Sequence, residues 1–239
     1  VLAVIGKKPV HDGLKIVGSH LDTPRLDLKG NPVHESDGVV YFRTHYYGGI
    51  KKYQWTCIPM ALIGVVYTRS GKKVEINVGM KDDDPVFYIS DLLIHMAQDQ
   101  MKKTLAQGIT GEQLQAICAT HSEENLAAKD ALMKFFKDTY GIEEEDFATA
   151  ELELVPATKS RDVGFDRSLI ASYGQDDRVC SYANLEAILH AEPGEYTQAA
   201  LLTDKEEIGS YGNTGMESSY FVKVVMKMLA LQGNGSLLE

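Results

Sequence analysis

Three apolar runs in this chain each end at a short cluster of residue types that bind metal ions. The clusters are His20-Leu21-Asp22, Asp176-Asp177-Arg178 and Asp204-Lys205-Glu206-Glu207. Each cluster lies where a buried β-strand would end. In open parallel sheets, ligands bind outside the carboxyl ends of the strands. The three clusters can therefore form one site if the fold brings these strand ends to the same edge.

The segments around the three clusters, at the start and in the last third of the chain, are expected to form strands and helices, which alternate in the last third. The predicted strands cover residues 1–6, 14–19, 169–173 and 198–203, and the predicted helices cover residues 179–191 and 218–231. This order is typical of a parallel sheet with helices on its faces. The pattern predicts an α/β fold with a mostly parallel sheet flanked by helices.

The middle of the chain has a different pattern. Residues 73–78 alternate apolar and polar side chains, and Ser70-Gly71 before them is a hairpin signal, so this block is expected to be antiparallel. Other expected elements are strands at 39–44, 60–68 and 152–155, helices at 90–107 and 122–140, a capping box at 110–113 and a C-cap at Gly141. We expect residues 46–162 to form an inserted β-rich domain, and residues 1–45 and 163–239 to form the α/β domain.

Charge and cysteine content narrow the function classes. The formal net charge of −10 and isoelectric point near 5.2 argue against a nucleic-acid binder. They fit a protein that holds cations or acts on small substrates, and a solvated acidic surface explains them equally well.

Cys57, Cys118 and Cys180 are far apart, which favours buried thiols in a reducing, cytoplasmic location. No apolar run is long enough to predict a membrane-spanning helix, and no signal peptide is expected.

The residue types of the first cluster suit a metal site. Imidazole nitrogen and carboxylate oxygen bind Zn²⁺, Mn²⁺ or Co²⁺. Asp22 lies two residues after His20, so both side chains point the same way along an extended chain, and Asp22 is placed to orient the imidazole. The alternative is a histidine–aspartate pair in an ordinary loop.

The two acidic pairs also have two interpretations each. Asp176 and Asp177 open a predicted helix, where carboxylates also act as N-caps. Glu206 and Glu207 repel each other unless a positive charge lies nearby, and their side chains diverge. One of them is then free to bind metal while the other acts as a general base. The alternative is a solvated acidic turn that Lys205 helps to neutralise.

Taken together, these segments resemble the M18 metallopeptidase family, the aspartyl aminopeptidases and their bacterial relatives. The matching segments, in family order, are residues 17–24, Asp176-Asp177 and residues 204–210, with further likeness at residues 47–50 and around Ile94-His95. The related M42 aminopeptidases share the site plan, but the inserted block that carries His95 favours M18.

The resemblance implies a two-metal peptidase site, with Zn²⁺ as the first choice and Mn²⁺ or Co²⁺ as alternatives. His20 would bind one metal, Asp176 would bridge both and Glu207 would bind the second. Glu206 would be the general base that takes a proton from the attacking water, and Asp22 would orient His20.

His95 matches a family histidine that reaches the active site of a neighbouring subunit, and its alternative is packing within a helix between Leu92 and Met96. The inserted domain of the family builds dimers that assemble into a dodecamer. The implied partners are peptide substrates and further copies of the chain, with neither nucleic acid nor membrane.

The chain departs from the family in its length. Family members extend beyond both ends, and their later segment supplies one more aspartate ligand and one more histidine ligand. No aspartate or histidine follows Glu207 in this sequence. Three explanations stay open: a piece of a longer polypeptide, an artificial end in which residues 233–239 are a linker remnant, or a sequence that joins only the ordered parts.

We therefore expect a metal-dependent aminopeptidase, or its truncated core, that removes the N-terminal residue of peptides. The alternative is a catalytically inactive oligomerisation or binding protein on the same scaffold, with residues 46–162 as its working part. The missing ligands favour this alternative. The intact Glu206-Glu207 pair disfavours it, because a binding module has no need of a spare base.

Overall fold

The computed structural model describes residues 1–120 and 126–232, and the chain divides into two compact units. Unit 1 combines Val1–Pro24 with Gly174–Glu239, and unit 2 is the intervening segment Arg25–Tyr173. These boundaries differ from the expected ones at 45/46 and 162/163. Residues 25–45 belong to unit 2 because they form two strands that pair with later strands of that unit.

The sheet of unit 1 has three strands. β1 (Leu2–Val4), β2 (Leu14–His20) and β12 (Thr197–Thr203) are arranged in the order β1-β12-β2. β12 runs parallel to β2, but β1 runs antiparallel to β12. The sheet described here is therefore mixed, and the expected parallel arrangement holds for the β2–β12 pair. The short connection between β1 and β2 reverses the chain, which forces β1 to run against both of the other strands.

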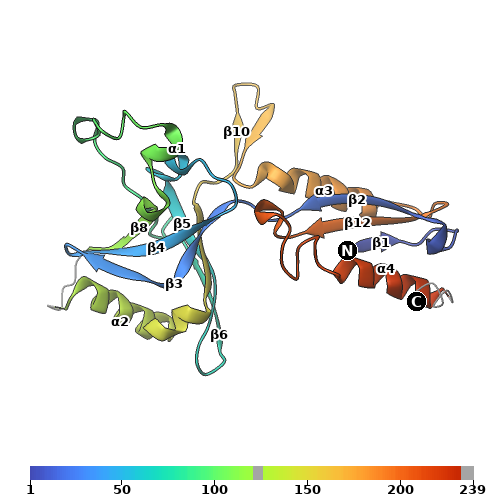
Figure 1. Ribbon diagram of the computed structural model, residues 1–239, viewed down its shortest axis with the longest axis horizontal. Coiled ribbons are helices and arrows are strands. Elements are labelled where there is room, and N and C mark those ends of the chain that lie inside the picture. The colour runs from blue at the N-terminus through green and yellow to red at the C-terminus, as the bar shows by residue number, and fades with distance from the viewer. Residues whose placement is uncertain (121–125, 233–239) are drawn as a thin grey trace. The chain divides into compact units, whose positions relative to one another are not determined.

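Two helices accompany this sheet, as the alternating pattern predicts. α3 (Gln175–Leu189) precedes β12, and α4 (Tyr220–Leu231) follows it. Figure 1 draws the two helices on opposite sides of the sheet. The centre of β12 is buried from Ala199 to Leu201, which explains its unbroken apolar sequence.

Unit 2 is built around a closed antiparallel sheet. Its strands are β3 (Arg25–Ser36), β4 (Val39–Tyr47), β5 (Pro59–Tyr67), β6 (Lys73–Val78), β7 (Phe87–Tyr88), β8 (Gln115–Ala119) and β9 (Glu151–Pro156). They are ordered β6-β5-β7-β8-β4-β3-β9, and β9 also pairs with β5. The β5–β9 pairing closes the sheet into a barrel, with β6 attached outside it. Closure satisfies backbone groups that an open edge would leave unpaired.

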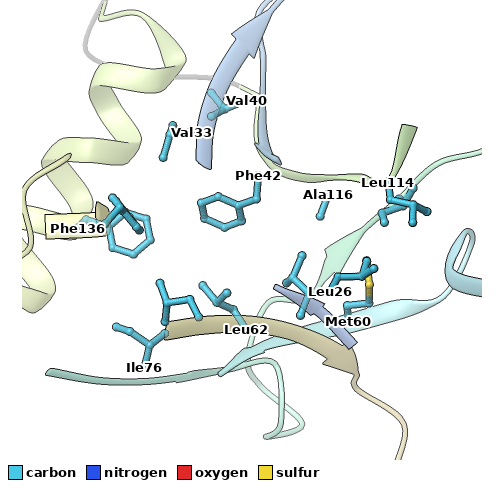
Figure 2. Close-up of a cluster of buried hydrophobic side chains, with 14 of the residues drawn as sticks. Leu26, Val33, Val40, Phe42, Met60, Leu62, Ile76, Leu114, Ala116 and Phe136 are labelled. Carbon is cyan, nitrogen blue, oxygen red and sulfur yellow. The ribbon is translucent and has the colours of Figure 1, made fainter. Parts of the chain in front are cut away.

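The core of unit 2 fills this barrel and the space under one helix. Figure 2 shows Phe42 and Leu62 inside a cluster of buried apolar side chains, with Phe136 of α2 (Ala128–Tyr140) beside them. Phe42 and Phe136 meet edge to face, with ring centroids 6.4 Å apart. Gly141 ends α2 in the left-handed conformation, as its sequence position predicts. The expected start of this helix at Ser122 lies outside the described residues.

The helix expected over residues 90–107 is wrong. This segment contains only a 3-10 turn at Ile94–Met96 and a short helix, α1 (Leu105–Gly108). The apolar side chains that suggested a helical face are exposed, Leu92 at 52% and Met96 at 71%. A helix of this length needs an apolar face packed against a partner, and that packing is missing here.

The shorter elements complete the description. 3-10 turns lie at Val10–Asp12, Lys52–Trp55, Gly111–Gln113, Glu144–Thr149 and Glu206–Ile208, and a hairpin is formed by β10 (Arg161–Val163) and β11 (Leu169–Ala171). The expected capping box at Thr110 and Gln113 is present.

Cys57 and Cys180 are exposed, so the expectation of buried thiols is wrong for both. Among the described residues, none of the helices has the length and apolar character that crossing a membrane requires.

Candidate metal centre

The register of two parallel strands brings the first and third clusters together. His20, the last residue of β2, is paired with Thr203, the last residue of β12. The chain after β12 turns at once into the 3-10 turn that begins with Glu206. Both clusters therefore leave the sheet at the same edge, where site residues were expected.

The His20 imidazole lies at the centre of the site. Its side chain is only 11% exposed, and its Nε2 atom lies 3.3 Å from Oδ1 of Asp176. The same nitrogen lies 3.6 Å from Oε2 of Glu206. The start of α3 thus completes the convergence of the three clusters.

Three side chains offer a compact set of ligand atoms. One nitrogen of His20 and one oxygen each of Asp176 and Glu207 all lie within 4.8 Å of one another. One imidazole and two carboxylates form a donor set that suits Zn²⁺ and similar divalent ions. The residues therefore fit a metal centre, and they are the three that the sequence singled out as ligands.

Asp22 contacts both His20 and the turn that carries Glu206 and Glu207. Its side chain is 1% exposed, with Oδ1 3.3 Å from His20 Nδ1. Its carboxylate accepts hydrogen bonds from the backbone N–H groups of Glu206, at 3.2 Å, and Glu207, at 3.1 Å. The Asp22 carbonyl oxygen also lies 3.0 Å from Nδ1. These contacts on Nδ1 leave Nε2 directed at the carboxylates.

The concentration of acidic groups shifts the pKa values of the site. Burial raises the pKa of Glu207, and the negative charge of Asp176 raises it further. Burial opposes protonation of His20, but the Asp22 carbonyl and the nearby carboxylates outweigh it, so the pKa of His20 is raised. The carboxylates therefore favour a positive charge at this position, whether a proton or a metal ion supplies it.

Asp176 and Asp177 have separate roles, and neither is a simple helix cap. Both have non-helical backbone angles and lie at a kink before the regular part of α3. Asp177 accepts a hydrogen bond from the His20 N–H at 3.3 Å. The Cys180 thiol and the His20 N–H lower the pKa of Asp177 by hydrogen bonding to its carboxylate. Asp177 thus supports the backbone of His20, while Asp176 carries the exposed carboxylate near Nε2.

His95 lies in unit 2, on the 3-10 turn Ile94–Met96, and is exposed. The alternative of a helix-packing histidine is wrong, because no helix forms there and both Ile94 and Met96 are exposed. Its role in a neighbouring subunit stays a prediction.

Known proteins are similar to this chain in sequence and in fold. The family model for the aminopeptidase I zinc metalloproteases (M18) matches residues 1–239. The chain belongs to the M18 peptidase family. A probable M18 family aminopeptidase 1 of Clostridium acetobutylicum is 46% identical over 238 residues, covering 98% of this chain and 51% of that protein. The Thermotoga maritima relative is 46% identical over 224 residues, covering 92% of this chain and 49% of that protein.

Solved M18 structures agree with the fold. The crystal structure of the Thermotoga maritima M18 aminopeptidase matches with a TM-score of 0.90 at 42% identity, over 97% of this chain and 54% of that one. Aminopeptidase I from Clostridium acetobutylicum also matches with a TM-score of 0.90, at 44% identity, over 96% of this chain and 51% of that one. The chain therefore spans about half the length of the M18 relatives that it matches.

The sequence analysis did not identify the residues that form hydrogen bonds to the backbone and side chains next to the candidate ligands. Ser181 and Asn184 of α3 form hydrogen bonds to Ser19, and Ser181 also contacts the His20 carbonyl. A signal for Ser181 was available, because it lies four residues after Asp177 and therefore on the same helix face. Its partner on β2 is far away in sequence, so the pairing itself could not be read from the chain.

Proposed function

We propose that this protein is a zinc-dependent aminopeptidase and that the chain supplies His20, Asp176 and Glu207 as metal ligands. The convergence of one imidazole and two carboxylates from three separate segments carries the proposal. A solvated acidic surface does not require a nearly buried histidine at its centre, whereas a metal site does.

The site is proposed to hold two divalent ions, with Asp176 between them. Its carboxylate has two oxygens and is 87% exposed, so both oxygens are accessible. When bound, the metal acts as a Lewis acid that polarises a peptide carbonyl and lowers the pKa of water. Zn²⁺ is the first choice, because the M18 family model is one of zinc metalloproteases and the donor set agrees.

Glu206 is proposed as the general base of peptide hydrolysis. Its side chain is 55% exposed and reaches within 3.6 Å of His20 Nε2, so it borders the ligand set while staying accessible to substrate. It accepts a proton from the attacking water and then donates it to the departing amine. Asp22 acts indirectly, because it holds the backbone of the Glu206-Glu207 turn and the ring of His20.

Assembly into larger oligomers is a further part of the proposal. Residues 46–162 are proposed to form a dimer interface and to carry His95 towards the site of a second copy. The S. cerevisiae protein mApe1, 21% identical to this chain, has been solved as a dodecamer. The exposed apolar segment around Leu93 and Met96 is consistent with a surface that a second copy covers.

The similarity to M18 aminopeptidases does not favour the alternative of an inactive scaffold protein, and metal content together with peptidase activity tests the proposal against it. We expect the purified protein to bind zinc and to release N-terminal residues from short peptides, and a chelator should abolish this release. Restoration by added Zn²⁺ is the control for the chelator. Absence of both zinc binding and peptide cleavage would contradict the proposal and favour the scaffold function.

A further inference from the structure

A buried polar cluster connects α3 to the end of β2. The Ser181 side chain contacts the His20 carbonyl oxygen at 2.8 Å and Ser19 Oγ at 3.0 Å. Asn184 Nδ2 donates to Ser19 Oγ at 2.9 Å. Ser181 is 4% exposed, so water competes little for these contacts.

The donors and acceptors of this cluster follow from the chemistry of its groups. A serine hydroxyl has one proton to donate and two lone pairs to accept with. The His20 carbonyl oxygen can only accept, so Ser181 donates to it. Ser181 Oγ is also placed to donate to Ser19 Oγ, so its one proton is shared between the two acceptors, and Ser19 Oγ accepts from Asn184 Nδ2. The three contacts form one cluster that joins Ser181 and Asn184 of α3 to the end of β2.

The cluster contacts the backbone of His20, whose imidazole is a proposed metal ligand. Asp176, the ligand nearest to His20 Nε2, lies at the non-helical start of α3, and Ser181 lies in the regular helix that follows it. Other hydrogen bonds connect the same segments: the His20 N–H donates to Asp177 at 3.3 Å, Thr23 Oγ1 donates to the Asp176 carbonyl at 3.3 Å, and Arg178 Nε donates to the Leu21 carbonyl at 3.4 Å. The Ser181–His20 contact is shorter than these three.

We propose that Ser181 is a positioning residue that sets the distance between His20 and Asp176, and so tunes metal affinity. The inference rests on the proposed metal site. A rigid link between the backbones of two ligands lowers the cost of bringing them together around an ion. The contact of Ser181 with Ser19, which Asn184 also binds, holds the Ser181 side chain against the end of β2.

The competing explanation is ordinary packing of a helix on a sheet, and Ile188 provides a matched control. It lies on α3 seven residues after Ser181, is 7% exposed and belongs to no hydrogen-bond chain to His20. If Ser181 only packs, Ser181→Ala and Ile188→Val should act alike: both should lower the melting temperature and leave zinc binding unchanged.

The test measures zinc affinity by competition with a chromophoric chelator, together with the melting temperature of the metal-free protein. We expect Ser181→Ala to weaken zinc binding about tenfold, the lower end of the effect of supporting residues in metal sites. Ile188→Val should keep the unaltered affinity. Asn184→Ala, which removes only the hydrogen bond from Asn184 to Ser19, serves as a second variant if Ser181→Ala does not fold, and should weaken zinc binding to a smaller extent.

Amide hydrogen exchange of the metal-free protein gives an independent readout. In Ser181→Ala the His20 amide should exchange faster, while amides in the middle of β12 keep their protection. Unchanged zinc affinity in both Ser181→Ala and Asn184→Ala, or an equal loss in Ile188→Val, would overturn the positioning role alone. Absence of zinc binding by the unaltered protein would instead overturn the proposed metal site, and the inference with it.

Discussion

The carboxylate of Asp22 accepts a hydrogen bond of 3.1 Å from the backbone N–H of Glu207. The two residues come from opposite ends of the chain, and the contact lies in a nearly solvent-free position because the Asp22 side chain is 1% exposed. The same carboxylate contacts the His20 imidazole. One acidic side chain therefore fixes two ligands of the proposed metal centre relative to each other.

Removing this carboxylate should damage both stability and metal binding. In Asp22→Ala the amides of Glu206 and Glu207 lose their acceptor, and unpaired buried donors cost about 1–3 kcal/mol each. Zinc affinity should fall roughly 10–100-fold because His20 loses its orientation. Denaturant unfolding and chelator competition measure the two effects. An Asp22→Ala variant with unaltered zinc affinity would show that His20 is held by its other contacts.

Changing Glu206 should separate catalysis from binding. Glu206→Gln keeps the size of the side chain but removes its basicity, so turnover should fall by about 10²–10⁴-fold, the usual contribution of a general base. Zinc content should stay near that of the unaltered protein, because Glu206 lies outside the proposed ligand set. Peptide hydrolysis and metal analysis on the same sample provide the check, and normal turnover would contradict the base assignment.

Zinc binding should weaken as the pH falls. The metal requires neutral His20 and ionised Glu207, and both groups have raised pKa values in the metal-free protein. Protons therefore compete from a higher pH than for ordinary histidine and glutamate. Below the His20 pKa, affinity should drop about tenfold per pH unit for each proton displaced. Calorimetric titration with zinc measures the affinity at each pH from about 5 to 8, around the usual pKa of histidine. A zinc affinity that does not change with pH would argue against His20 as a ligand.

Closure of the unit 2 barrel should depend on Gly64. This residue has a φ of 135° on β5, and a Cβ there would lie 2.0 Å from the backbone oxygen of Glu151 on β9. Gly64→Ala should therefore destabilise the barrel by roughly 2–4 kcal/mol, because either the strand pairing or the backbone angle must change. Gly30→Ala is the matched control, since nothing lies within 4 Å of a Cβ at that position. Equal melting temperatures for the two variants would contradict the role of Gly64 at the seam.

Much of the fold was predictable from short-range pattern. β6 occupies Lys73–Val78, the range given by its alternating side chains, and β5 and β12 begin within one residue of their expected starts. β3 was missed because its sequence includes Gly30, Asn31 and Pro32, which usually mark turns. Its pairing with β4 and β9 overrides that local preference. The false helix at 90–107 failed for the opposite reason, since a favourable local pattern found no surface to pack against.

The sequence singled out the three candidate ligand residues that the structure brings together, but not the residues that support them. His20 and Glu207 follow β2 and β12, whose ends share one sheet edge, as the apolar runs predict. The run before Asp176 is different, because it forms β11, an exposed strand that pairs with β10 in unit 2 and lies outside this sheet. The contacts of Ser181 and Asn184 depend on how α3 packs on β2, which no local signal contains. The roles of the ligands, the number of metal ions and the function of His95 stay predictions that the experiments above address.

The order of segments in unit 1 also has a consequence for how this protein is made. Val17 and Ala200 are neighbours across the β2–β12 pair, yet all of unit 2 lies between them in the chain. During synthesis on the ribosome, β2 cannot pair with β12 until unit 2 and β12 have been synthesised. Unit 2 contains its own closed sheet and core, so it can fold in the meantime and shorten the loop that β2 and β12 must close. An insertion that folds first therefore leaves a shorter loop to close before the candidate metal centre can assemble.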